Sequence, residues 1–148
     1  MNTANSILSF FRYLGLGSLI AIGVLSEVPG GLRPHIFAVS QLEHVVAYFA
    51  AALLLALGFW NRRKLLLLSS ALPIYAAVLE ITQMFIPGRS SEFIDFFASS
   101  GGACAGILSA WLLYSACRLT VVRKAFLSRV SPRAPRHGKV LTKVPSSQ

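Results

Sequence analysis

The sequence predicts an all-α fold: a four-helix transmembrane bundle with both termini in the cytoplasm and a basic, disordered C-terminal tail. Hydrophobic residues make up 55% of the 148 residues and charged residues only 13%. A soluble domain carries roughly a quarter charged residues. The charges are also clustered, so they leave four long apolar runs between them. These observations indicate an integral membrane protein.

Each apolar run is near or above the length of about 17 residues that crosses the hydrocarbon layer. The predicted spans are residues 7–24, 44–60, 65–86 and 96–117. Trp60 ends the second span, where an amphipathic ring favours the membrane interface. Pro73 lies inside the third span and predicts a kink, because proline removes a backbone donor. Residues 1–117 therefore form the predicted membrane domain, and 118–148 the tail. Residues 119–130 of this tail could continue as a surface helix, and the predicted disorder concerns the rest.

The fourth span carries small residues at every fourth position. They are Ala98, Gly102, Gly106 and Ala110. Small residues at this spacing form a stripe along one helix face, which lets another helix approach closely. We expect this stripe to be a helix-packing surface.

The distribution of basic residues predicts the orientation. Arg62, Arg63 and Lys64 follow the second span as a tight loop, and eight of the fourteen Lys and Arg residues lie after Cys117. The positive-inside rule places both groups in the cytoplasm. The connections at 27–43 and 87–95, which each sum to one negative charge, then face outward.

The basic tail follows directly after a membrane span. Its expected partner is therefore the anionic headgroups of the lipid bilayer, at about 1 kcal/mol per basic residue near the surface. The alternative is that the positive charge of the tail only fixes the orientation of the protein in the membrane. We expect no nucleic-acid partner.

Polar residues from distant parts of the chain should converge at the outer end of this bundle. The candidate polar pocket consists of His44, Tyr48, Glu80, Gln83, Arg89 and Asp95. Glu80 is the most informative, because a carboxylate inside an apolar span costs roughly 2.5–3.5 kcal/mol on insertion scales. A histidine and a carboxylate can perform acid–base chemistry, and an arginine can hold a phosphate or carboxylate. The alternatives are that Glu80 only locks the bundle by pairing with Arg89 or His44, and that Asp95 only caps the fourth helix.

The sequence contains no recognisable cofactor motif. A metal site from Glu43, His44, Glu80 and Asp95 is conceivable, but no ligand motif such as His-Glu-x-x-His is present. We therefore expect neither a metal nor another cofactor. Glycine-rich phosphate loops and nucleophile elbows are also missing from the sequence. Whether the protein is an enzyme stays open.

At these residues the sequence resembles the VanZ-like family of small bacterial membrane proteins. The matching pieces are residues 44–49, 80–83 and 87–89, with Asp95, Gly102 and Gly106. The family usually has an Asp-Lys pair where this chain has Ser40 and Gln41, and an asparagine where it has Ser99. If that lysine and asparagine contribute to a shared activity, these departures imply altered binding in this chain.

The resemblance implies a multi-pass protein of the bacterial inner membrane, associated with the cell envelope. The founding member of the family is linked to antibiotic resistance, specifically to teicoplanin. Our leading hypothesis is an outward-facing polar pocket that binds an envelope precursor or a glycopeptide. A membrane enzyme acting on a lipid-linked headgroup is one alternative. A structural or partner-binding membrane subunit is the other.

Overall fold

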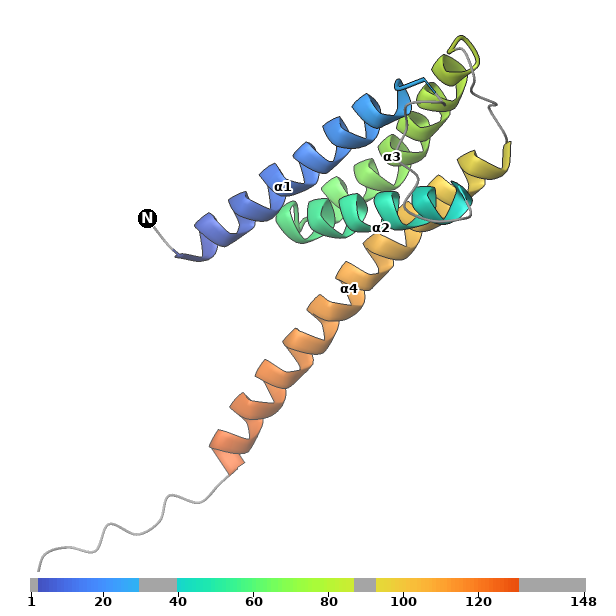
Figure 1. The fold of residues 1–148 in the computed structure, drawn as a ribbon. Coiled ribbons are helices and arrows are strands. Elements are labelled where there is room, and N and C mark those ends of the chain that lie inside the picture. The colour runs from blue at the N-terminus through green and yellow to red at the C-terminus, as the bar shows by residue number, and fades with distance from the viewer. Residues whose placement is uncertain (1–2, 30–39, 87–92, 131–148) are drawn as a thin grey trace, which may run out of the picture. The chain divides into compact units, whose positions relative to one another are not determined.

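The computed structural model describes residues 3–29, 40–86 and 93–130, and within these residues it contains four α-helices and no strand (Figure 1). The helices are α1 (Thr3–Ser26), α2 (Ser40–Gly58), α3 (Arg62–Gln83) and α4 (Phe93–Val130). Each contains a segment long and apolar enough to cross a membrane. The predicted all-α fold with four spanning helices is therefore confirmed. The side of the membrane on which each terminus lies stays a prediction.

The observed α3 begins earlier than the sequence predicted, at Arg62 rather than at Leu65. The cause is the N-cap residue Asn61, whose side-chain oxygen accepts a hydrogen bond from the Arg63 backbone N–H at 2.9 Å. Such a cap satisfies one of the donors left free at the start of a helix. Arg62, Arg63 and Lys64 therefore form the first turn of α3, with exposed side chains, instead of a separate loop.

The chain divides into two compact units, Met1–Ser115 and Ala116–Gln148. The first unit contains α1, α2, α3 and the part of α4 before residue 116. In the second unit the helix continues to Val130. The predicted disorder concerns residues 131–148, which lie outside the described residues.

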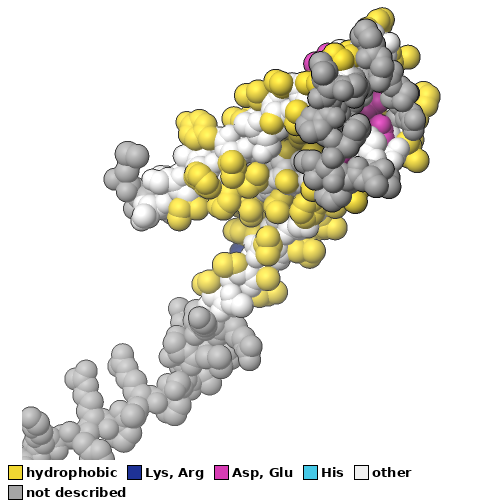
Figure 2. All heavy atoms as spheres, in the orientation of Figure 1, with side chains coloured by type: hydrophobic (Ala, Val, Ile, Leu, Met, Phe, Trp, Pro, Cys, Tyr) yellow, Lys and Arg dark blue, Asp and Glu magenta, His cyan; other side chains and the backbone are white. Residues whose placement is uncertain are grey.

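The core of the first unit is centred on α2. Its fully buried members are Tyr48, Ala52 and Leu55 of α2, Leu72 and Ala76 of α3, and Ala103 of α4. Large apolar side chains are instead abundant on the surface, as the yellow atoms of Figure 2 show. A helix that is apolar on both its inner and outer faces is typical of a lipid environment. The carboxylates visible in Figure 2 gather at one end of the unit.

Side-chain hydrogen bonds connect α1 to the C-terminus of α2 and to α3. Arg12 Nε donates to the Gly58 carbonyl at 2.6 Å, and its guanidinium lies over the Phe59 ring at 5.2 Å from the centroid. Tyr75 donates from its hydroxyl to the Leu19 carbonyl at 2.8 Å. The first bond places a cation at the C-terminus of α2, where the helix dipole favours it.

The structure carries α3 through Pro73 without interruption. The Ser69 hydroxyl donates to the Leu66 carbonyl at 2.8 Å, and the Ser70 hydroxyl lies within bonding distance of the Leu66 and Leu67 carbonyls. Serine hydroxyls in apolar surroundings often find such carbonyl acceptors in the preceding turn. The kink stays a prediction.

The α2 and α4 backbones come into direct contact at two glycines of α4. A Cβ on Gly102 would lie 3.0 Å from Val45 Cα and against the Val45 carbonyl oxygen. A Cβ on Gly106 would meet the Phe49 carbonyl oxygen and lie 2.9 Å from the Leu53 backbone nitrogen. These neighbours are backbone atoms, which cannot move aside without shifting the helix. Any larger residue must therefore separate the two helices.

Replacing Gly102 with alanine should lower the free energy of unfolding by about 1–3 kcal/mol, because the new methyl overpacks the α2 contact. Gly101→Ala is the matched control, since a Cβ at Gly101 has no atom within 4 Å. Thermal unfolding of both variants in detergent, followed by circular dichroism, measures the difference. Equal melting temperatures for the two variants would contradict the close packing of α4 on α2.

Candidate polar site between α2, α3 and α4

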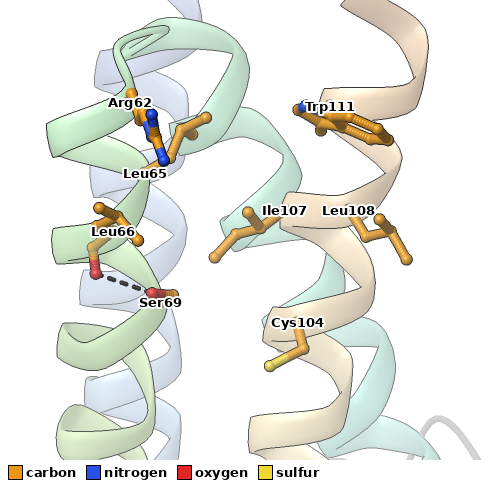
Figure 3. Close-up of a pocket in the computed structure, with 8 residues that line it drawn as sticks. All are labelled: Arg62, Leu65, Leu66, Ser69, Cys104, Ile107, Leu108 and Trp111. Carbon is orange, nitrogen blue, oxygen red and sulfur yellow. Dashed lines mark hydrogen bonds between the residues drawn. The ribbon is translucent and has the colours of Figure 1, made fainter. Parts of the chain in front are cut away.

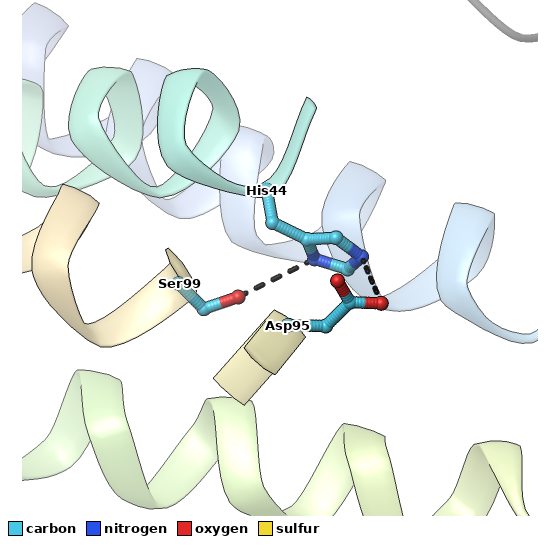
Figure 4. Close-up of polar contacts among 3 residues, drawn as sticks. All are labelled: His44, Asp95 and Ser99. Atoms are coloured by element: carbon cyan, nitrogen blue, oxygen red, sulfur yellow. Dashed lines mark hydrogen bonds and ion pairs between the residues drawn. The ribbon is translucent and has the colours of Figure 1, made fainter. Parts of the chain in front are cut away.

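His44, in the first turns of α2, lies between two polar side chains of α4 (Figure 4). Its Nε2 is 3.7 Å from Asp95 Oδ2, which makes an ion pair when the ring is protonated. On the other side of the ring, Nδ1 is 3.3 Å from Ser99 Oγ. His44, Asp95 and Ser99 are 7%, 7% and 1% exposed, so all three side chains are buried inside the protein. A buried arrangement of this kind fixes the position of the imidazole ring.

The spacing of residues on α4 explains why Asp95 and Ser99 face His44. Asp95, Ser99, Gly102 and Gly106 follow one another at intervals of four, three and four residues. Such residues lie on one face of a helix. Gly102 and Gly106 lie against α2, and Gly102 contacts Val45, the residue next to His44. The same face therefore presents Asp95 and Ser99 to the start of α2.

The last turns of α3 contribute Glu80 and Gln83, which are 8% and 2% exposed. One ligand atom each of His44, Glu80 and Asp95 lie within 4.8 Å of one another. We call these three side chains the His44–Glu80–Asp95 cluster. Its members come from three helices and from sequence positions up to 51 residues apart, so only the folded bundle assembles it.

Three buried polar atoms of α3 and α4 have no hydrogen-bond partner in the described part of the chain. They are Gln83 Nε2, Asp95 Oδ1 and Ser100 Oγ. A buried polar atom without a partner costs about 1–3 kcal/mol, and native structures contain few of them. Asp95 therefore keeps one oxygen available to a further donor or cation.

An apolar cavity of about 420 Å³ adjoins the cluster between α3 and α4. Its lining consists of Ala77, Glu80, Ile81, Met84, Phe93, Phe96 and Phe97. Glu80 is the only ionisable residue among the described residues of this lining, and it belongs both to the polar cluster and to the wall of the cavity. This combination suits a ligand with a polar group attached to an apolar part.

A second cavity between α3 and α4, of about 490 Å³, lies along the earlier part of α3 (Figure 3). Its lining consists of Arg62, Leu65, Leu66, Ser69, Cys104, Ile107, Leu108 and Trp111. The Ser69 hydroxyl is bonded to the Leu66 carbonyl, and Arg62 is the only charged residue among the described residues of the lining. This cavity is separate from the polar cluster and shares no lining residue with the first one.

The other residues considered for the site have different surroundings, and the roles of Tyr48 and Arg89 in a pocket stay predictions. Tyr48 is 2% exposed and belongs to the apolar core, where its ring lies 6.5 Å from that of Tyr75. Arg89 lies outside the described residues, so its place in the pocket stays a prediction. Glu43 is half-buried and is not part of the set whose ligand atoms converge.

Ser99 was missed as a site residue by the sequence reasoning, which treated it only as a departure from the family pattern. Its position four residues after Asp95 was the available signal, because that spacing puts both side chains on one helix face. The structure places its hydroxyl at the His44 ring. A serine can give or accept a hydrogen bond at this position, much as the usual asparagine can.

The fold and the cluster define a multi-pass membrane protein with a buried polar group between three of its helices. The profile of the VanZ/LLP1 family matches residues 5–114 of the chain. The chain belongs to the VanZ/LLP1 family. No match was found among curated proteins or among solved structures.

The contact between His44 and Asp95 predicts that their substitutions are not independent. In a double-mutant cycle with His44→Gln and Asp95→Asn, the coupling in unfolding free energy should be about 0.5–3 kcal/mol. The same cycle with His44→Gln and Glu27→Gln is the control and should give a value near zero. Glu27 is an exposed carboxylate that accepts a hydrogen bond from Thr82, and it is not one of the three residues whose ligand atoms converge. Additive effects of His44→Gln and Asp95→Asn would contradict the assembled cluster.

Proposed function

We propose that this VanZ-family membrane protein binds an envelope component at the His44–Glu80–Asp95 cluster. The component we propose is amphiphilic: its polar or anionic group sits at the cluster, and its apolar part lies in the cavity that Glu80 borders. A lipid-linked envelope precursor has this chemistry. A glycopeptide antibiotic, as in teicoplanin resistance, is the other ligand that the family relationship suggests.

One observation carries this proposal: Glu80 is shared between a buried polar cluster and an apolar cavity. A carboxylate that only locked helices together would need no cavity beside it. Ionisable groups within membrane spans are costly, and they commonly mark functional sites. The cavity volume of about 420 Å³ lies within the roughly 300–1,000 Å³ of ordinary ligand pockets.

The residues would act in different ways on such a ligand. Glu80 would accept a hydrogen bond or a proton from the polar group, and His44 would donate or relay a proton. Asp95 and Gln83 would orient these two side chains. Arg89 would hold an anionic group through paired hydrogen bonds.

We also propose that the protein lies in the inner membrane. The cluster would open outward, and the basic tail would lie on the anionic headgroups of the cytoplasmic face. The excess of Lys and Arg near Arg62 and after Cys117 supports this orientation through the positive-inside rule. The cluster then meets components of the envelope rather than of the cytoplasm.

The decisive test compares envelope lipids and lipid-linked intermediates in cells that lack the protein. The cells are complemented with wild type, Glu80→Gln or Glu27→Gln at matched membrane levels, and lipid extracts are analysed by mass spectrometry. We expect one class of intermediate to respond to wild type and Glu27→Gln but not to Glu80→Gln. Glutamine preserves the side-chain shape while removing the charge, so the difference isolates the carboxylate.

The outcomes separate the candidate functions. A chemically altered species that depends on Glu80 would indicate a membrane enzyme acting on the headgroup. An unaltered species that only changes in abundance would indicate binding or transport. Identical profiles in all strains, together with unchanged teicoplanin susceptibility, would contradict the proposal and favour a partner-binding subunit.

A further inference from the structure

We propose that His44, Glu80 and Asp95 bind a divalent transition-metal ion, with zinc as the best-suited ion. This replaces the expectation from the sequence, which contains no metal-binding motif. The observation behind it is that one donor atom from each residue lies within 4.8 Å of the other two, and all three residues are buried. No sequence pattern brings these donors together, because each comes from a different helix.

The donor spacing is close to that of a bound metal. In a tetrahedral zinc site with bonds of about 2.1 Å, neighbouring ligand atoms are about 3.4 Å apart. The distance from His44 Nε2 to Asp95 Oδ2 is 3.7 Å. The third donor, a Glu80 oxygen, lies within 4.8 Å of one donor atom of each of these two residues. Small side-chain rotations at Glu80 would therefore complete a three-ligand set.

The donor chemistry selects the class of ion. Imidazole nitrogen with carboxylate oxygen is a ligand set that zinc accepts, whereas magnesium and calcium prefer oxygen alone. Two carboxylates also neutralise a divalent cation, which removes the charge that would otherwise be costly between apolar helices. Zinc sites with three protein ligands leave a fourth position open.

A second observation points to a cation independently of the spacing. Asp95 is only 7% exposed, yet its Oδ1 is buried with no hydrogen-bond partner among the residues that the structure describes. Figure 4 shows this carboxylate turned toward the His44 ring. A carboxylate oxygen accepts bonds or binds cations and has no donor role when ionised. A metal at the cluster that is bound by both oxygens of this carboxylate would satisfy Oδ1 as well as Oδ2.

Ser99 supplies the supporting contact that metal-bound histidines require. When Nε2 binds the metal, Nδ1 carries the proton and donates a hydrogen bond to an acceptor, which fixes the ring. Ser99 Oγ lies 3.3 Å from His44 Nδ1 and is buried on α4. This contact leaves Nε2 directed at Asp95, as the metal site needs.

The metal would also take part in the proposed function, and only this part of the inference rests on that function. Glu80 lines the apolar cavity, so the open position of the metal would lie beside the space proposed for the ligand. A phosphate or carboxylate oxygen of an amphiphilic ligand would be suited to that position. Zinc binding is tested without any such ligand, so the two proposals can fail separately.

The test uses the full chain purified in detergent, with any affinity tag removed. The exposed residues Cys104 and Cys117 are both changed to serine, because thiolates also bind zinc. The protein is stripped with a chelator and equilibrated with zinc, and bound metal is measured by inductively coupled plasma mass spectrometry. We expect about one zinc ion per chain in this cysteine-free protein, which serves as the wild-type background for the variants, as a single three-ligand site predicts.

Variants assign the bound ion to the cluster. Asp95→Asn and Glu80→Gln should each weaken zinc binding at least tenfold, and Ser99→Ala by about tenfold through its effect on the His44 ring. Glu27→Gln, which removes an exposed carboxylate, should bind zinc like wild type. Equal zinc binding by Asp95→Asn and wild type would overturn the proposal.

If a cluster variant does not fold, two measurements on the protein with an intact cluster still test the zinc site. Zinc should raise the melting temperature, because an ion that binds only the folded state stabilises it. X-ray absorption of the zinc-loaded protein should show only nitrogen and oxygen ligands at about 2.0–2.2 Å. No bound zinc in folded wild type, or no shift in its melting temperature, would refute the site.

Discussion

The backbone contact between α2 and α4 is the constraint on which the polar site depends. Gly102 and Gly106 bring α4 against the carbonyl groups of Val45 and Phe49, at a distance that no larger residue allows. This contact sets the rotation of α4 about its axis, so the residues one and two turns earlier must face the start of α2. A histidine of α2 and an aspartate of α4 thereby share one buried space, although fifty residues separate them in sequence.

The distribution of polar groups follows from the same bundle. Apolar side chains cover most of the described surface, whereas buried ionisable groups concentrate where the ends of α2, α3 and α4 meet. Removing charges from water costs several kcal/mol per ion unless partners or counter-ions compensate. Packing alone would be served better by apolar residues of similar volume. The proposal of a binding site rests on this contrast, because Glu80 adjoins both a second carboxylate and an apolar cavity.

The sequence predicted the four spanning helices because apolar runs and charge clusters leave a strong signal. It also predicted that His44, Glu80 and Asp95 would lie at one end, since alternating helix directions require this. It did not predict the start of α3, because the Asn61 cap extends the helix into basic residues. Nor did it predict the role of Ser99 or the converging donor atoms, because both depend on how α4 is rotated against α2.

Solid-state nuclear magnetic resonance can measure the contact on which this account depends. Asp95 is the only aspartate in the sequence, so labelling aspartate side-chain carbon with ¹³C gives a single carboxylate signal. With ¹⁵N in the histidine rings of protein in lipid bilayers, this signal should be strongly dephased by His44, as the 3.7 Å ion pair requires. The dephasing should disappear in His44→Asn. An aspartate signal without dephasing in folded wild type would show that α4 does not present Asp95 to α2, and would contradict the site.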